Sequence, residues 1–464
     1  MHQEPVLVTG DPKAISYVCA NDDLFPRNEA TKQVLQTVFP NSVFVQEGEE
    51  HRRQKKLVSG AFTYETRFEK MFTRKSSTLL SPPAVQELSD ILYDLANQMV
   101  DQWKGELETS TDAEYIVNVQ KSIQVLATDA ISRSALAYSI KDSKGPVKDL
   151  LARLGDLEDN QLTVFLQLVL NKIPWLSKLP NPVTLRWFRF RAELGYIADD
   201  VWEKGVLNHA FHSRLLEAIG QDQRDIAIGQ ITAILFAGSE TTANIIVETV
   251  HKLTVYPHIQ DKLRKELTEF VKKQGMPIPY ADLINPTALP YLDAVMKEAL
   301  RCLASVPHLQ RRAGVRTDIP LEFPIRLSNG KVVQEIHVEP GQDIFMPVRD
   351  GINTSPELWG PESKKFIPER WLDGTIPKIV ETIQVPGHIL TFGDGPKYCL
   401  GRAFAFAEFK IFLSTMLLNF EFLTPQSEDI NKIIFHLSGP AVKPTVKGRE
   451  KEGPALPLAI KLLS

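Results

Sequence analysis

One cysteine stands in a short loop that leads straight into a helix. The stretch FGDGPKYCLGRAFAFAEFK, residues 392–410, places Cys399 among glycines and a proline and directly before an apolar, helix-forming run. The positive end of that helix would point at the sulfur and favour the thiolate, which is the nucleophilic and metal-binding form of cysteine. The alternative is that Cys399 is a small buried side chain in a turn, because free cysteine is commonly buried.

A second group of polar residues interrupts an apolar helical pattern. The segment AGSETT, residues 237–242, lies in the middle of the long run IAIGQITAILFAGSETTANIIVETVHKL. Glycine disfavours helix and buried polar groups need partners, so these residues indicate a functional role. The alternative is a glycine that packs against another helix, flanked by polar residues at the surface.

A pair of opposite charges lies on a third segment. In LPYLDAVMKEALR, Glu298 and Arg301 are three positions apart and can pair on one helix face. Most such pairs are solvated and contribute little stability. This segment is otherwise apolar, and Arg370 follows in FIPERW, so a buried charge cluster is the stronger interpretation.

The elements that must position these residues change in character along the chain. From about residue 11 to residue 303 the pattern is mostly helical, and the run around AGSETT predicts a central buried helix. After residue 303 short strands flank the hairpin turn Asn329-Gly330, a proline-rich coil covers residues 353–395, and one last helix and further strands follow. No linker divides the two parts, so we predict a mainly α fold with a smaller β part (α+β), forming a single domain over residues 1–464.

Composition excludes several classes of protein. The 53 Lys and Arg residues against 57 Asp and Glu residues give a net charge of -4, without the basic excess of a dedicated nucleic-acid binder. Three widely separated cysteines form neither a disulfide framework nor a zinc motif. No nucleotide-binding glycine motif, signal peptide or membrane-spanning run is present in the sequence.

The loop around the cysteine resembles a known motif. Phe392, Gly395, Lys397, Cys399 and Gly401 fit the pattern F-x-x-G-x-[basic]-x-C-x-G, which resembles the haem-binding loop of the cytochrome P-450 (haem-thiolate) family. The resemblance implies haem b as cofactor with Cys399 as the axial thiolate of its iron, which favours O–O cleavage. It also implies that the glycines let the backbone pass close to the macrocycle, and that Lys397 faces a haem propionate where many members have arginine.

Further matches to this family follow in the correct order. AGSETT resembles its oxygen-activating segment, which implies that Thr241 helps to deliver protons to dioxygen and that Glu240 relays them to solvent. Glu298, Arg301 and Arg370 match a buried triad that fixes the coil beneath the haem.

Weaker matches concern the propionates of the haem. In HRRQKKLVSGAF, the spacing of His51 and Lys55 resembles the propionate-binding helix, although tryptophan and arginine are common there in other branches. In LQRRAGVRTDIPL, Arg311 matches a third propionate contact, with Arg312 as the alternative. Basic residues on a helix face are otherwise usually just solvated.

The resemblance, which is closest to fungal microsomal members, implies a haem-dependent monooxygenase. It would insert one oxygen atom of dioxygen into a lipophilic terpenoid, polyketide or fatty-acid-like molecule, with secondary metabolism as the setting. Electrons would come from a separate NADPH-cytochrome P-450 reductase, with cytochrome b5 as a further donor, at the cytosolic face of the endoplasmic reticulum membrane. We expect substrate walls around residues 231–236 and in LASVPHL, residues 303–309. The alternatives are a haem-thiolate isomerase or dehydratase and a catalytically silent haem or lipophile-binding protein.

The beginning of the chain carries one more expectation. VLVT, Val6 to Thr9, is typical of a strand that runs into a helix opening near Asp11. In the family the matching strand is the second of a hairpin and follows a partner strand, a helix, a hinge and a membrane anchor. We therefore expect in-frame coding sequence upstream of the Met1 codon, because an unpaired strand edge and uncovered apolar surface are liabilities.

Overall fold

The computed structural model describes residues 5–61, 82–111, 114–136, 138–139, 169, 179, 181–203, 224–427, 429–438 and 441–463. The helices are α1 (Pro12–Ala20), α2 (Glu29–Val38), α3 (Gly48–Ala61), α4 (Pro82–Thr109), α5 (Val119–Leu136), α8 (Pro182–Glu203), α10 (Arg224–Val255), α11 (Pro257–Gln274), α12 (Tyr280–Ile284), α13 (Pro290–Cys302), α14 (Pro356–Trp359) and α15 (Arg402–Asn419). The strands are β1 (Leu7–Val8), β2 (Ile116–Asn118), β3 (His308–Arg312), β4 (Thr317–Arg326), β5 (Val332–Val338), β6 (Asp343–Pro347), β7 (Phe420–Leu423), β8 (Ile433–Ser438), β9 (Ala441–Val446) and β10 (Pro457–Leu462).

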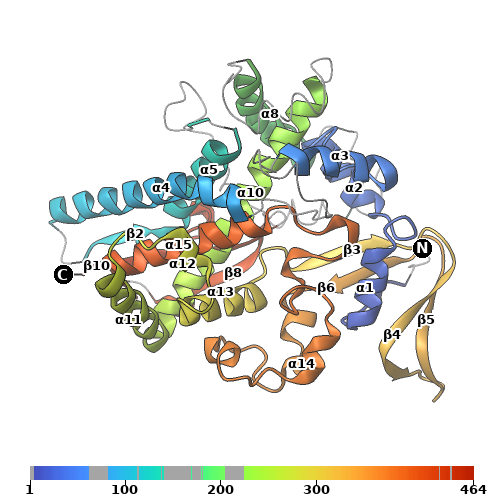
Figure 1. The fold of residues 1–464 in the computed structure, drawn as a ribbon. Helices are drawn as coiled ribbons and strands as arrows, with labels where there is room; N and C mark the ends of the chain where they lie inside the picture. The colour runs from blue at the N-terminus through green and yellow to red at the C-terminus, as the bar shows by residue number, and fades with distance from the viewer. Residues whose placement is uncertain are drawn as a thin grey trace, which may run out of the picture.

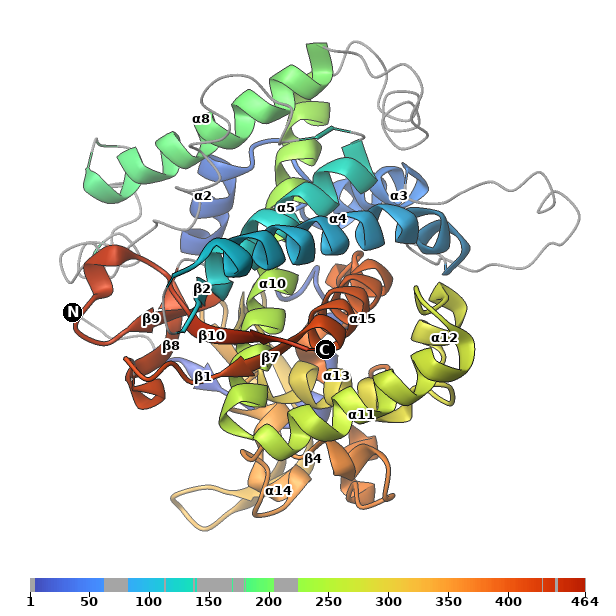
Figure 2. The ribbon, with the colours of Figure 1, turned by 90° about the vertical axis from the view of Figure 1, so that its left-hand side faces the viewer.

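The helix α10 runs through the middle of the helical part of the molecule. It is 32 residues long, and from Ser239 onward nearly every position is buried. A helix that is buried on all sides must be covered by others, and α5, α8 and α15 pack against it (Figures 1 and 2). The central buried helix predicted around AGSETT is therefore present, and it places these residues inside the molecule.

Four small sheets complete the fold. β1, β6 and β3 form one sheet, in which β6 is central, parallel to β1 and antiparallel to β3. β2, β10 and β7 form a second antiparallel sheet, and the hairpins β4-β5 and β8-β9 form the other two. Figure 1 shows β3, β6 and the β4-β5 hairpin on the side of the molecule away from α4 and α11.

The first helix is fixed at its start by a side-chain cap. The carboxylate of Asp11 accepts a hydrogen bond from the backbone N–H of Ala14 at 2.9 Å, and Pro12 occupies the first turn. The same carboxylate accepts bonds from the backbone N–H groups of Glu322 and Phe323 in β4. Asp11 therefore joins α1 to the sheet side of the molecule.

The mainly α fold with a smaller β part is confirmed, and its boundary lies where the sequence indicated. α13 ends at Cys302 and β3 begins at His308, while Gly330, with φ 84°, lies in the turn between β4 and β5. The strand expected at Val6–Thr9 is β1, at the edge of its sheet. One feature was not predicted: the strand β2 lies within the helical part and pairs with β10. It has only three residues, IVN, and so short a segment carries too little pattern to be recognised in the sequence.

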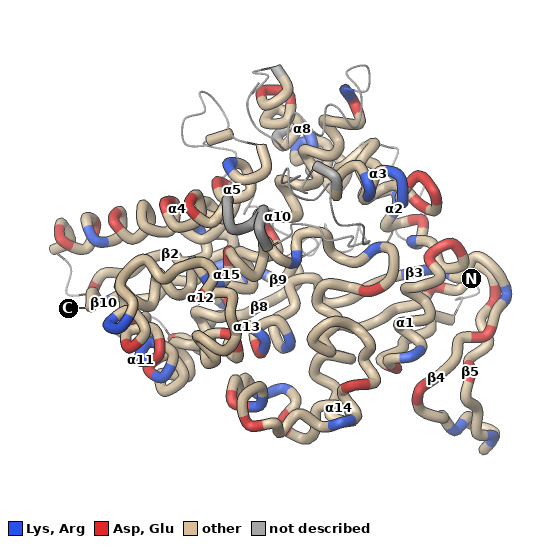
Figure 3. Tube along the Cα trace, in the orientation of Figure 1, with Lys and Arg blue, Asp and Glu red and all other residues tan. Residues whose placement is uncertain are grey.

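The distribution of charge agrees with the balanced composition. Acidic and basic residues are interspersed along α11, whereas the charged residues of α4 are mainly acidic (Figure 3). None of the described helices combines the length and the apolar character that crossing a bilayer requires.

Candidate active site

The loop that carries Cys399 is built from two short 3-10 turns followed by α15. The turns are η6 (Leu390–Phe392) and η7 (Gly395–Lys397). The backbone N–H of Cys399 donates to the carbonyl of Phe392 at 2.8 Å, which closes the loop. Gly395 has φ 65°, and a Cβ built on it would lie 2.2 Å from the Cys19 carbonyl oxygen of α1. This glycine therefore lets α1 and the loop pack closely.

The Cys399 thiol is accessible although protein surrounds its position. Cys19 and Cys302 are buried, whereas Cys399 is exposed. Burial of its surroundings nevertheless raises the pKa of the Cys399 thiol, against the opposing effects of the Gly401 backbone N–H and the charges of Lys55 and Arg402. The thiol is therefore accessible although protein surrounds its position in the loop.

Basic residues gather beside this loop from four separate segments. Together they are Arg27 before α2, His51 and Lys55 on α3, Arg311 on β3, and Lys397 in the loop. Burial, followed by the charges of Lys397, Arg27 and Lys55, lowers the pKa of His51 to about 4. His51 is therefore neutral at ordinary pH. We call these five residues the cation cluster.

Two members of the cation cluster have unused hydrogen-bonding atoms. Within the described residues, His51 Nδ1 and Arg311 Nε are buried without a hydrogen-bond partner. Lys55 is satisfied by the loop itself: its Nζ donates to the Tyr398 carbonyl at 3.1 Å and to that of Pro396, and lies 3.6 Å from the centroid of the Tyr398 ring. Buried donors without partners are costly, so this cluster is suited to an anionic ligand.

Lys397 departs from the expected arrangement. We expected it to face a haem propionate, but its ammonium group contacts the carboxylates of Glu47 and, at 3.2 Å, Asp22. Its side chain is only 3% exposed. A lysine has one compact charge, and two carboxylates reach it from the segments on either side of α2, so the pairing satisfies it internally.

On α10, glycine and threonine have distinct roles. A Cβ on Gly238 would lie 2.5 Å from the Ile131 side chain of α5, so the helix-packing interpretation of this glycine is correct. The Thr241 hydroxyl donates back to the Ala237 carbonyl at 2.8 Å, and α10 continues through this position without a break. Its own carbonyl accepts a bond from the Ser305 hydroxyl at 2.7 Å.

Glu240 is neither exposed nor free. Its carboxylate lies 2.7 Å from Nζ of Lys443 in β9, and the two side chains are 4% and 2% exposed. The expected relay from Glu240 to solvent therefore begins, in this structure, at a buried ion pair. The surface alternative for the polar residues of AGSETT does not apply to Glu240.

The structure brings Glu298, Arg301 and Arg370 together. The Glu298 carboxylate accepts bonds from Arg301 at 2.8 and 2.9 Å and from Arg370 at 3.0 Å. It also accepts bonds from Trp371 Nε1 at 2.9 Å and from the Ile367 backbone at 2.8 Å. Glu298 and Arg301 are 0% exposed, so all of these bonds lie in the interior.

A match over almost the whole chain decides the family. The family model described as "Cytochrome P450" matches residues 1–447. The chain belongs to the cytochrome P-450 family.

Fungal monooxygenases are among the relatives of this P-450. It is 28% identical to cytochrome P-450 monooxygenase claQ of Ampulloclitocybe clavipes over 474 aligned positions, which cover 97% of this chain and 83% of the relative. It is 27% identical to cytochrome P-450 monooxygenase 128 of Postia placenta over 493 positions, which cover 98% and 84%. The chain is thus a cytochrome P-450 monooxygenase, an oxidoreductase whose cofactor is haem with a cysteine thiolate ligand.

The residues of this P-450 fit that cofactor. The accessible Cys399 thiol suits an iron ligand, and the unpartnered His51 Nδ1 and Arg311 Nε suit carboxylate groups such as propionates. Burial lowers the pKa of Lys55 to about 8, while the charge of Cys399 opposes this shift, so the cation cluster reaches the thiol.

Sequence reasoning missed two buried charged residues near this site. Glu408 on α15 is 0% exposed, and burial raises the pKa of its carboxyl well above the usual value, against a hydrogen bond from Thr242. The other is Lys443, within the fully buried strand AVKPTV. Each stands in an apolar segment, FAFAEFK or AVKPTV, and an isolated charge in such a run was the available signal.

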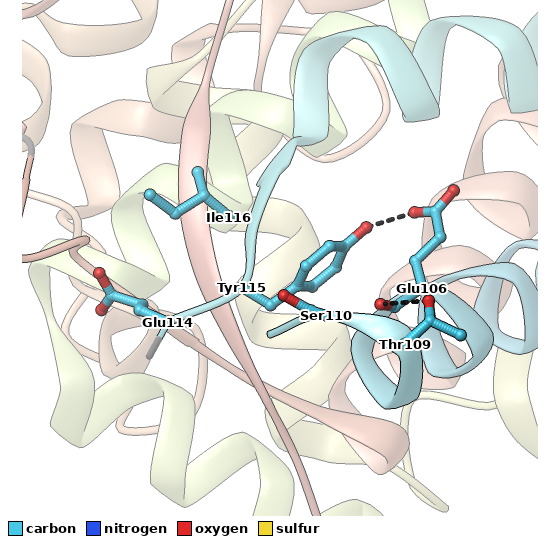
Figure 4. Close-up of a pocket in the computed structure, with 6 residues that line it drawn as sticks. All are labelled: Glu106, Thr109, Ser110, Glu114, Tyr115 and Ile116. Atoms are coloured by element: carbon cyan, nitrogen blue, oxygen red, sulfur yellow. Dashed lines mark hydrogen bonds between the residues drawn. The ribbon is translucent and has the colours of Figure 1, made fainter. Parts of the chain in front are cut away.

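A surface pocket elsewhere in the P-450 is unrelated to this arrangement. About 430 Å³ in volume, it is lined by Glu106, Thr109, Ser110, Glu114, Tyr115 and Ile116 (Figure 4). The Tyr115 hydroxyl donates to the Glu106 carboxylate there. α4 and β2, which border it, carry none of the predicted site residues, so the pocket is not the active site.

Proposed function

We propose that this monooxygenase inserts one oxygen atom of dioxygen into a lipophilic small molecule with a terpenoid, polyketide or fatty-acid-like skeleton, in secondary metabolism. The observation that carries the proposal is the accessible Cys399 thiol beside a cation cluster with unpartnered buried donors. Cys399 would supply the thiolate ligand of the haem iron, and His51, Lys55 and Arg311 would hold the haem propionates. When bound, the haem supplies the activation of dioxygen.

The residues of α10 move protons in this mechanism. The Thr241 hydroxyl, fixed by its bond to the Ala237 carbonyl, hands a proton onward into the site. Glu240 relays the next proton from solvent to Thr241, in a general acid role. Glu298, Arg301 and Arg370 hold the end of α13 against the coil of residues 353–371, because Arg301 also donates to the Asn353 and Ser363 carbonyls.

An aromatic cluster supports a lipophilic substrate. Phe236 of α10 stacks near Phe39, next to α2, and Phe190 of α8, with ring centroids 5.0 and 5.5 Å apart. Phe39 also contacts Phe44 at 5.5 Å. Phe236 lies in the α10 segment where we expect a substrate wall, and the rings of Phe39 and Phe190 pack against it, so this side of the proposed site is apolar.

Partners and location follow from the family. We propose that electrons come from a separate NADPH-cytochrome P-450 reductase, with cytochrome b5 as a further donor, at the cytosolic face of the endoplasmic reticulum membrane. A monooxygenase, as claQ and 128 are named, needs a source of electrons, so we include such a donor in the proposal.

The test uses the spectrum of the reduced protein with carbon monoxide. Thiolate-ligated haem gives a red-shifted Soret band, so we expect this band in the wild type and its complete loss in Cys399→Ala. Cys302→Ala is the matched control, because Cys302 is buried beside Glu298 and should leave the band in place. A band that persists in Cys399→Ala would overturn the assignment of the ligand.

Turnover separates the remaining alternatives. With the reductase, NADPH and lipophilic metabolites of the host, we expect oxidised products that carry one atom of labelled dioxygen. A rearranged product formed without NADPH would indicate an isomerase or dehydratase, which the presence of both Thr241 and Glu240 argues against. A thiolate band with ligand binding but no product would indicate a silent binding protein.

A further inference from the structure

The ion pair between Glu240 and Lys443 joins two parts of the chain that are far apart in sequence. Glu240 lies on α10 and Lys443 in β9, and their carboxylate and ammonium groups are 2.7 Å apart. Every residue of β9 is buried, and Lys443 is one of the largest fully buried side chains. Glu240 takes part in no other ion pair among those of the described residues.

The same strand also reaches the neighbouring residue of α10. The Val442 backbone N–H donates to the Ser305 carbonyl at 3.0 Å, and the Ser305 hydroxyl donates to the Thr241 carbonyl at 2.7 Å. β9 therefore supports positions 240 and 241 of α10 at once, the first through Lys443 and the second through Ser305. These are the two positions to which the proposed proton transfer is assigned.

Stability alone is a weak reason to keep such a pair. Desolvation of two charges offsets most of their attraction, and hydrophobic replacements of buried pairs are often neutral or stabilising. Loss of one partner leaves the other charge buried without compensation, which is strongly unfavourable. The pair therefore fixes the charge and the direction of Glu240 more than it strengthens the fold.

We propose that Lys443 is a positioning residue for oxygen activation. It holds the Glu240 side chain in place and stabilises its carboxylate form, to which Glu240 returns each time it has taken up a proton from solvent and passed that proton to the Thr241 hydroxyl. Without Lys443, the buried carboxyl group keeps its proton to avoid an unpaired charge and no longer releases it to Thr241. This inference rests on the proposed function of Glu240 and Thr241.

The test measures how reducing equivalents divide between product and hydrogen peroxide. In Lys443→Met, we expect product formed per NADPH to fall at least tenfold and peroxide to rise, as in Glu240→Gln. The variant that carries both substitutions should form no less product per NADPH than either single variant, because each substitution alone already disables the pair of Glu240 and Lys443. Lys443→Arg keeps the charge and should recover part of the coupling.

A second readout follows Glu240 itself, independently of turnover. In Lys443→Met, the infrared spectrum should gain the carbonyl stretch of a protonated carboxyl group, and Glu240→Gln in the same background should remove it. Loss of coupling without this band would overturn the inference, because Lys443 would then act otherwise than through the charge of Glu240.

Lys410 offers a matched control. It is another buried lysine, 2.8 Å from Asp293, with side-chain exposures of 2% and 10%, in a pair between α15 and α13 that does not involve Glu240. Lys410→Met should lower stability, though less than Lys443→Met because Lys297 remains 2.8 Å from Asp293, and should leave the division between product and peroxide unchanged. Unchanged coupling in Lys443→Met, or additive losses in the double variant, would overturn the inference while the carbon monoxide band and product formation still supported the proposed function.

Discussion

Two buried charged regions of this P-450 differ in how completely they are satisfied. Around Glu298, one carboxylate accepts bonds from Arg301, Arg370, Trp371 and the Ile367 backbone. In the cation cluster, by contrast, His51 Nδ1 and Arg311 Nε have no partner among the described residues. Because buried polar groups are nearly always paired, the difference supports our proposal that a ligand completes the cation cluster, whereas the region around Glu298 is complete as protein.

The complete region should be the more sensitive to loss of one charge. Glu298→Gln removes the anion shared by Arg301 and Arg370 and leaves two guanidinium groups buried without it. We expect a loss of about 3–5 kcal/mol in the free energy of unfolding. Urea denaturation of the haem-loaded protein measures this loss.

Glu362→Gln provides the control for this prediction. Glu362 pairs with Lys365 at 2.6 Å, but both side chains are more than half exposed, so we expect a change of less than about 1 kcal/mol. Equal effects of the two substitutions would show that the buried triad is not a special stabilising unit.

Lys397 belongs to the cation cluster, but unlike His51 Nδ1 and Arg311 Nε its ammonium group has protein partners. Lys397→Met leaves the Glu47 and Asp22 carboxylates without their ammonium partner, and we expect a loss of about 1–3 kcal/mol, between the values for exposed and fully buried pairs. If Lys397 held a propionate instead, the substitution would chiefly accelerate haem loss. Unfolding curves and transfer of haem to apomyoglobin, measured on the same variant, distinguish these outcomes.

The sequence indicated candidate site residues better than it indicated how these residues pair. Cys399, Glu298, Arg301 and Thr241 could be found because glycine-rich loops, helical spacing and polar interruptions of apolar helices are local patterns. The pairing of Lys397 with Glu47 could not be found, because no local pattern tells which distant carboxylate will reach a buried lysine.

The same limit applies to the fold. Long helices such as α10 carry many periods of their pattern, whereas β2 has three residues and is defined only by pairing with β10. The partner of Glu240 likewise comes from a strand 200 positions away, so its exposure could not be judged from the AGSETT segment alone.

The incomplete region should respond through haem binding and less through stability. Arg311→Met removes an unpartnered donor, so we expect haem to transfer to apomyoglobin about tenfold faster, corresponding to the roughly 1.4 kcal/mol of one charged hydrogen bond. Arg312→Met is the control and also tests the alternative assignment, since Arg312 pairs with Asp343 at 2.8 Å. Faster transfer in Arg312→Met alone would move the propionate contact to Arg312.

The smallest effect at neutral pH concerns the charge of His51. Its pKa is lowered to about 4, from an ordinary value near 6.5, by burial and by Lys397, Arg27 and Lys55. The unfolded chain therefore binds a proton between these two pH values that the folded chain does not bind, so the stabilising contribution is complete above pH 6.5 and is lost as the pH falls toward 4. For one proton, the free energy of unfolding changes by at most about 1.4 kcal/mol per pH unit.

His51→Asn tests this pH dependence with and without haem. In haem-depleted protein, we expect the free energy of unfolding to fall less steeply between pH 6.5 and 4 in His51→Asn than in the wild type. In haem-loaded protein the difference should shrink, because a nearby propionate favours the protonated ring and raises its pKa. His251 is the control: burial lowers its pKa to about 4 as well, but it lies on α10 against Phe435, so the effect of His251→Asn should be the same in both forms. A His51 contribution that haem leaves unchanged would place the propionates elsewhere and would remove His51 from the ligand-completed region.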